Sequence, residues 1–115
     1  MPKNILKSAN LSSFGFHLVF NLWPPKGKTF KPHKHIFHSK ETKIAQESWV
    51  VVRGSVKVFL YDLDDSILRE EIIYPGDASI TLYGGHTYEI LEDDTVVYEY
   101  KTGPYMGVEK DKEFI

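Results

Sequence analysis

Four side chains of the kinds that transition metals prefer are spaced along this sequence: His33, His35, Glu47 and His86. In an extended strand, residues i and i+2 point to the same face. The imidazoles of His33 and His35 can therefore bind one ion at about 2.1 Å from each nitrogen. Glu47 and His86 on neighbouring strands would complete the site. Three imidazoles, one carboxylate and no thiolate suit Fe, Mn, Ni, Co or Zn without choosing among them.

The elements that must position these side chains are predicted to be strands. Runs rich in aromatic and β-branched residues alternate with turns rich in Pro, Gly and Asp, at 14–23, 29–36, 47–53, 55–61, 67–74, 78–82, 86–91 and 95–101. Residues 37–46 are polar and predict a loop. Gly54, between two apolar runs, predicts a tight hairpin in which glycine supplies a positive φ. Short strands at this spacing are typical of a sandwich or a barrel.

Alternation along the strands predicts which side chains point inward. Glu47 shares a face with Trp49 and Val51, so its carboxylate is expected inside the barrel, where it needs a partner such as a cation. Tyr88 and Ile90 share the side of His86.

The next strand is ambiguous, because Tyr98 and Tyr100 share one face and Glu99 and Lys101 share the other. Alternation does not decide which face is inside. Tyr88, with either Tyr98 or Glu99, is a candidate for proton transfer or for a hydrogen bond to the substrate. Packing of aromatic rings is the simpler interpretation of each tyrosine taken singly.

Composition narrows the class of protein. The 115 residues predict a single domain, and 42% apolar with 26% charged residues is ordinary for a folded chain. No apolar run is long enough to cross a bilayer and residues 1–8 lack a signal-peptide segment, so a cytoplasmic location is expected. The chain contains no cysteine, which excludes disulfides and thiolate chemistry.

Charge is unevenly distributed along the chain. Residues 1–45 carry eight Lys and one acidic residue, whereas residues 46–115 carry six basic and fifteen acidic residues. The lysines at 26, 28, 31 and 34 predict either a solvated strand edge or an approach that favours an anionic substrate. Nucleic-acid binding fits poorly, because the chain has only two Arg and no recognition motif.

Taken together, these residues resemble a small single-domain cupin, a double-stranded β-helix or jelly-roll barrel. The first cupin motif is matched by the His33-Lys34-His35 pair and by the spacing from Glu47 to Gly54. The second is matched by Pro75-Gly76-Asp77 through Gly84-Gly85-His86. The resemblance covers about residues 28–101 of a domain spanning 1–115. It implies an all-β fold, one divalent metal ion and a homodimer.

Two features depart from the cupin pattern. Eleven residues separate His35 from Glu47, more than the family usually has, so an enlarged loop is expected beside the site. The second motif has Leu82-Tyr83-Gly84 in place of Pro-x-Gly. Glu41 lies in the enlarged loop between His35 and Glu47, so it is an alternative carboxylate ligand. His38 is either a loop residue or a substrate contact, and His17 is expected to be structural.

Three classes of function remain open. The resemblance implies first a metal-dependent enzyme, of dioxygenase or isomerase type, acting on a small polar or anionic molecule. The second is a metal-independent sugar-nucleotide isomerase or epimerase of polysaccharide synthesis, which uses histidine and tyrosine as acid and base. The third is a non-catalytic module that binds a small ligand.

Overall fold

A computed structural model describes residues 24–115 of the chain. Contacts divide the chain after Glu41, so that residues 24–41 belong to one unit and Thr42–Ile115 form a second. Each unit is described by itself. The predicted strand at 14–23 and His17 lie outside the described residues.

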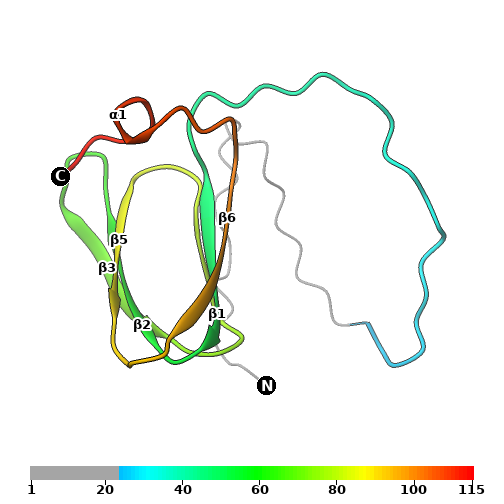
Figure 1. The fold of residues 1–115 in the computed structure, drawn as a ribbon, viewed down its shortest axis with the longest axis horizontal. Coiled ribbons are helices and arrows are strands. Elements are labelled where there is room, and N and C mark those ends of the chain that lie inside the picture. Colours follow the sequence, from blue (N-terminus) through cyan, green and yellow to red (C-terminus); the bar gives the residue numbers. More distant parts are fainter. Residues whose placement is uncertain (1–23) are drawn as a thin grey trace. The chain divides into compact units, whose positions relative to one another are not determined.

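The second unit consists of six strands and one short helix (Figure 1). The elements are β1 (Glu47–Arg53), β2 (Val56–Tyr61), β3 (Ile67–Ile73), β4 (Ala78–Thr81), β5 (Gly85–Ile90), β6 (Val96–Lys101) and α1 (Val108–Asp111). The strands form two antiparallel sheets with the orders β4-β1-β6 and β3-β2-β5. The predicted all-β class is confirmed, and the six strands predicted between 47 and 101 form within two residues of their expected ends. Within residues 24–115, no helix has the length and apolar character needed to span a membrane.

Two local predictions are wrong. Residues 29–36 do not form a strand, and Pro32 in their middle lacks the N–H that a central ladder position needs. Gly54 has the expected positive φ of 83° but does not close a hairpin. β1 pairs with β4 and β6, whereas β2 pairs with β3 and β5. Gly54 therefore turns the chain from one sheet into the other.

The facing sides of the two sheets change from apolar to polar along the strands. Val51, Val56 and Val58 are buried and form the core, against which Trp49, Leu60, Ile73, Tyr88 and Val97 pack. On β1 the inward side continues from Val51 through Trp49 to Glu47. The strand register sets Glu47 beside Thr81 on β4 and Lys101 on β6. The polar end of this interior therefore gathers side chains from three strands of one sheet.

The turn at Gly54, where the chain passes from one sheet to the other, leads to a prediction about stability. A Cβ at Gly54 would lie 2.9 Å from the backbone Cα of Thr95, whereas a Cβ at Gly76, which has a similar φ of 93°, meets nothing within 4 Å. Both Gly→Ala changes should cost about 1–2 kcal/mol because φ is positive. Gly54→Ala should cost at least about 1 kcal/mol more, because of the steric overlap. Urea unfolding measures both variants, and equal losses would contradict the predicted clash.

Candidate functional site

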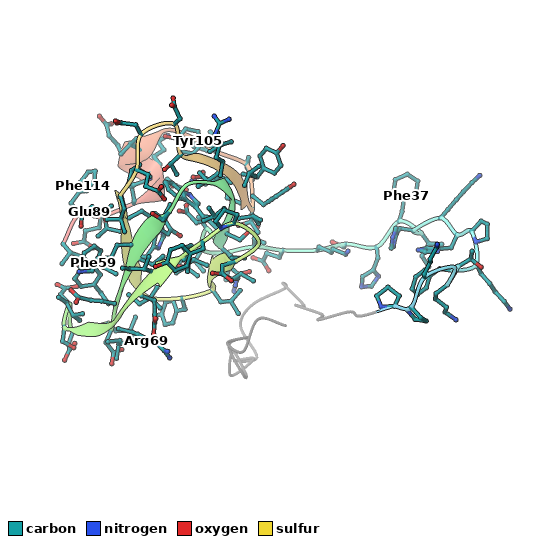
Figure 2. All side chains as sticks on the ribbon, turned by 90° about the horizontal axis from the view of Figure 1, so that it is seen from below. Phe37, Phe59, Arg69, Glu89, Tyr105 and Phe114 are labelled. Carbon is teal, nitrogen blue, oxygen red and sulfur yellow. The ribbon has the colours of Figure 1, made fainter. Side chains whose placement is uncertain are left out.

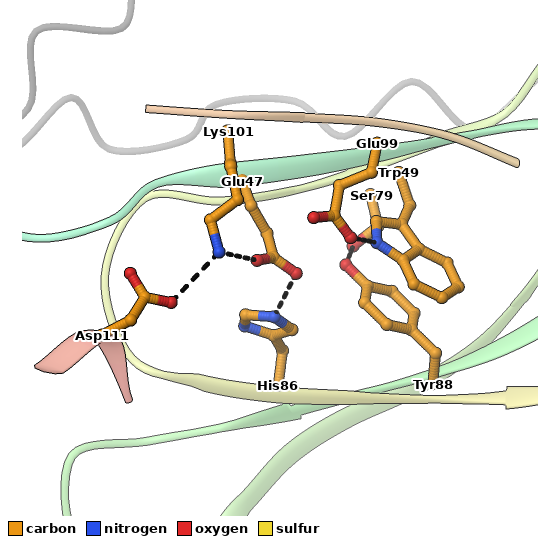
Figure 3. A network of polar contacts seen from close by, with 8 residues as sticks. All are labelled: Glu47, Trp49, Ser79, His86, Tyr88, Glu99, Lys101 and Asp111. Atoms are coloured by element: carbon orange, nitrogen blue, oxygen red, sulfur yellow. Dashed lines mark hydrogen bonds and ion pairs between the residues drawn. The ribbon is translucent and has the colours of Figure 1, made fainter. Parts of the chain in front are cut away.

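Glu47 and His86 form a close polar pair inside the second unit (Figure 3). Nε2 of His86 lies 2.7 Å from Oε1 of Glu47, and only 12% of the Glu47 side chain is exposed. The ammonium of Lys101 lies 3.8 Å from the other carboxylate oxygen. The carboxylate therefore has a hydrogen-bonding partner on one oxygen and a positive charge beside the other. Alternation along β1 and β5 had predicted this inward orientation for both residues.

Lys101 is held from its other side by the C-terminal segment. Its Nζ donates a 3.1 Å hydrogen bond to Oδ2 of Asp111 in α1, and it lies 5.0 Å from the centroid of the Tyr105 ring. The hydrogen bond to Asp111 raises the pKa of Lys101, with smaller contributions from the charges of Glu47 and Glu99. Lys101 therefore remains an ammonium at neutral pH, so it can donate hydrogen bonds but is not a base.

An aromatic pair lies next to the Glu47–His86 pair. The rings of Trp49 and Tyr88 are stacked, with centroids 3.9 Å apart and planes at 7°. Trp49 Nε1 donates a 2.7 Å hydrogen bond to Oε2 of Glu99, and the Tyr88 hydroxyl donates a long 3.5 Å bond to Ser79 Oγ. Burial raises the pKa of Tyr88, so its phenol stays neutral at physiological pH. The centroid of the Tyr88 ring is 5.5 Å from that of His86.

Several buried polar atoms close to Glu47 have no hydrogen-bond partner. Among the described residues these atoms are Gln46 Oε1, Thr81 Oγ1 and His86 Nδ1. Gln46 precedes Glu47 in the chain, Thr81 is its neighbour on β4, and His86 is bonded to it. Burying a polar atom without a partner is unfavourable, so such atoms are rare in folded proteins. Two of these three atoms therefore belong to residues that pair with Glu47 across the sheet or contact its carboxylate.

The two remaining predicted ligands, His33 and His35, lie in the unit of residues 24–41. Their rings approach edge to face, with centroids 5.3 Å apart, and Nδ1 of His33 is 3.0 Å from the carbonyl oxygen of Lys31. Both side chains are exposed, as are His38 and the alternative ligand Glu41. The pair thus keeps its two imidazoles close together without being part of a strand. The four-ligand set remains a prediction.

No group of three or more His, Asp or Glu side chains within residues 24–115 is arranged to hold a metal. Glu47 and His86 are two of the four predicted ligands, and the Lys101 ammonium beside Glu47 would oppose the binding of a cation. In the second unit these residues form a polar cluster in which Glu47 contacts His86 and lies near Lys101.

The structure decides which face of β6 points inward. Glu99 and Lys101 face the interior, whereas Tyr98 lies on the outer face with 56% of its surface exposed. Of the three candidates for proton transfer, Tyr88 and Glu99 therefore adjoin the Glu47–His86 cluster and Tyr98 does not.

Sequence reasoning missed Lys101 and Asp111. The only sequence signal for Lys101 was that it shares a strand face with Glu99. No pattern in the sequence indicated Asp111.

The Lys101–Asp111 contact predicts a pH-dependent contribution to stability. Because the pKa of Lys101 is raised on folding, this contribution is complete below the unfolded-state pKa and is lost as pH rises through the folded-state pKa. Asp111→Asn should therefore lower the free energy of unfolding at neutral pH, and the difference from the wild type should shrink in strongly alkaline solution. Urea unfolding across pH tests this, with exposed Glu109→Gln on the same helix as control. A deficit that does not change with pH would contradict it.

No protein-family model matches the sequence, no curated protein matches it, and no solved structure matches the fold. The cluster around Glu47 is the group of buried polar side chains in the second unit on which a proposed function can rest.

Proposed function

We propose that this chain is a small cytoplasmic cupin of jelly-roll type, an enzyme that moves a proton on a small carbonyl compound through its Glu47–His86 pair. The observation that carries the proposal is the 2.7 Å contact between the two side chains, in an interior where His86 Nδ1 is buried and unpaired. Unpaired buried polar atoms and a histidine–carboxylate pair are typical of functional sites. The two antiparallel sheets and the motif residues support the family assignment.

The pair has the chemistry of a general base. A carboxylate that accepts the Nε2–H of an imidazole fixes its tautomer and stabilises the imidazolium when the ring takes up a proton. With Nε2–H donated to Glu47, the free nitrogen of His86 is Nδ1, and Nδ1 is the atom that accepts a proton from a substrate C–H next to a carbonyl. Returning that proton to a different carbon, or to the opposite face of the same carbon, completes an isomerisation or an epimerisation.

Lys101 supplies the electrostatic part of this mechanism. Loss of a proton next to a carbonyl leaves negative charge on the carbonyl oxygen. The Lys101 ammonium, 3.8 Å from the Glu47 carboxylate, stabilises that charge as it develops. The raised pKa of Lys101 keeps the ammonium charged, and Asp111 holds it in position from the opposite side.

The charges of the interior favour a neutral, hydroxyl-bearing substrate. Three carboxylates, those of Glu47, Glu99 and Asp111, are near Lys101 and His86, so a fully anionic molecule would meet net repulsion. A keto sugar is a neutral molecule with hydroxyl groups and therefore fits these charges. It could be free, or it could be carried on a nucleotide that stays outside this interior. The stacked Trp49–Tyr88 pair supplies an apolar surface with polar groups on both sides, as small-molecule sites commonly do.

Thermal-shift screening of keto sugars and nucleotide sugars should identify a ligand, because binding to the folded state alone raises apparent stability. Proton transfer can then be followed as deuterium incorporation into that ligand in D₂O, detected by NMR. Glu47→Gln and His86→Gln should each slow incorporation by at least about 100-fold, the usual contribution of acid–base catalysis.

Lys101→Met should also slow incorporation by at least about 100-fold, with partial rescue in Lys101→Arg. Glu89→Gln, on β5 but exposed, is the matched control and should leave the rate unchanged. Ligand binding without deuterium incorporation would rule out the enzyme and favour the non-catalytic binding module.

The metal-dependent enzyme remains a second candidate, favoured by the proximity of the His33 and His35 rings. It predicts near-stoichiometric Fe, Mn, Ni, Co or Zn in protein purified without chelator. That metal should be lost in His33→Ala and in His86→Ala, and retained in His38→Ala. Elemental analysis measures it, and protein that stays metal-free when offered each ion would eliminate this candidate.

A further inference from the structure

The C-terminal segment, residues 102–115, crosses one end of the second unit, from β6 toward β5 (Figure 1). It leaves β6 directly after Lys101, in one sheet. Its last residue, Ile115, reaches the first residue of β5 in the other sheet, because a Cβ added to Gly85 would lie 2.5 Å from Cδ1 of Ile115. The segment therefore bridges the two sheets at the end of the interior where the cluster around Glu47 lies.

The cluster beneath this segment is largely closed to solvent. The exposed fraction of the side chain is 12% for Glu47, 25% for His86, 20% for Lys101 and 13% for Asp111. The Nδ1 atom of His86, which has no hydrogen-bond partner, is buried. A small molecule can therefore reach Nδ1 only if a part of the structure moves.

The C-terminal segment is weakly attached beyond its first two residues. Among the described residues, one hydrogen bond connects residues 104–115 with the rest of the second unit, the 3.1 Å bond from Lys101 Nζ to Oδ2 of Asp111. The helix α1 buries none of its residues. Tyr105 and Phe114 both lie at the surface, with 55% and 81% exposed (Figure 2). A segment with so few buried apolar contacts opens at a small cost in free energy.

The start of the segment, in contrast, is fixed by several hydrogen bonds. The backbone N–H of Thr102 donates to the carbonyl oxygen of Gln46 at 2.9 Å, and Thr102 Oγ1 accepts a 3.0 Å bond from the Gln46 N–H. The Thr42 hydroxyl donates to the carbonyl oxygen of Gly103 at 3.3 Å. The segment is therefore held firmly at Thr102–Gly103 and loosely beyond.

A cleft leaves room beside α1. Its volume is about 190 Å³, and it is lined by residues 42–45, by residues 102–104 and by Lys110 and Asp111 of α1. Protein interiors are otherwise close-packed, with few voids larger than a water molecule. The helix therefore lacks close packing at the residue that contacts Lys101.

We propose that residues 104–115 form a lid over the Glu47–His86 cluster, hinged at Thr102–Gly103 and held closed by the contact between Lys101 and Asp111. Opening the lid separates Asp111 from Lys101 and exposes His86 Nδ1 to a small molecule. Lys101 keeps the Glu47 carboxylate 3.8 Å away when Asp111 leaves, so its charge stays partly compensated. Closing the lid restores the hydrogen bond and excludes water, as active-site lids do. The lid controls access to the interior whichever reaction takes place there.

Chemical modification of His86 in the full chain tests the lid without a substrate. Diethylpyrocarbonate acylates imidazole nitrogens that it can reach, and peptide mass spectrometry measures each histidine separately. In the wild type, His86 should react at least about tenfold more slowly than the exposed His38, because it reacts only while the lid is open. Asp111→Ala should speed the reaction of His86 at least about fivefold, because it removes the hydrogen bond from Lys101. Glu109→Ala, an exposed position of the same helix, is the matched control and should leave the rate unchanged.

A disulfide that locks the lid gives a second measurement, which compares one protein with itself. The chain contains no cysteine, and Gly85→Cys with Ile115→Cys places two thiols at an existing contact, within reach of a disulfide. In the oxidised protein, His86 should react at least about tenfold more slowly than after reduction, whereas His38 should react equally in both states.

Three results would overturn the lid. The first is wild-type His86 that reacts as fast as His38, since the interior would then be open. The second is an equal rate for His86 in the oxidised and reduced proteins. The third is a His86 rate that rises with urea as steeply as global unfolding does, because opening a lid exposes far less surface than unfolding the whole unit.

Discussion

The rest of the site depends on the burial of one carboxylate. Glu47 lies on the inward side of β1, where an uncompensated charge would be strongly unfavourable. His86 and Lys101 compensate it, and Lys101 is in turn held by Asp111 from a helix that follows the last strand. The Glu47 carboxylate between the two sheets thus links β1, β5, β6 and the C-terminal segment. The same requirement explains why the interior is apolar at one end and charged at the other.

Placing polar groups inside a sheet affects its outside as well. A strand alternates its side chains between two faces. On β6 the inward positions are occupied by Glu99 and Lys101, and the remaining large residues, Tyr98 and Tyr100, must face outward. The opposite sheet supplies mainly apolar residues to the core and carries charges on its outer face. The chemistry of the site and the character of the outer surface therefore follow from the same alternation.

Much of the candidate site was predictable, but only for residues whose position follows from local pattern. Glu47 and His86 were expected to face inward because alternation on their own strands requires it. Lys101 could not be assigned, since Glu99 and Lys101 form a face as plausible as Tyr98 and Tyr100 until β6 is paired with β1. Asp111 could not be predicted at all, because its contact with Lys101 depends on the path of the C-terminal segment. The predicted ligand pair His33 and His35 lies in a separate unit, and its relation to Glu47 remains a prediction.

The sequence by itself determined the six strands between 47 and 101 and the turns that separate them. These features depend on interactions within a few residues, namely side-chain alternation, Pro–Gly punctuation and the positive φ available to glycine. Only the tertiary structure decided that Gly54 joins two sheets instead of closing a hairpin, and that Glu99 and Lys101 face the interior. Residues 29–36 have a strand-like composition but form no strand, because a strand also needs a hydrogen-bonded neighbour. Strand pairing is a long-range property, and local sequence pattern does not specify it.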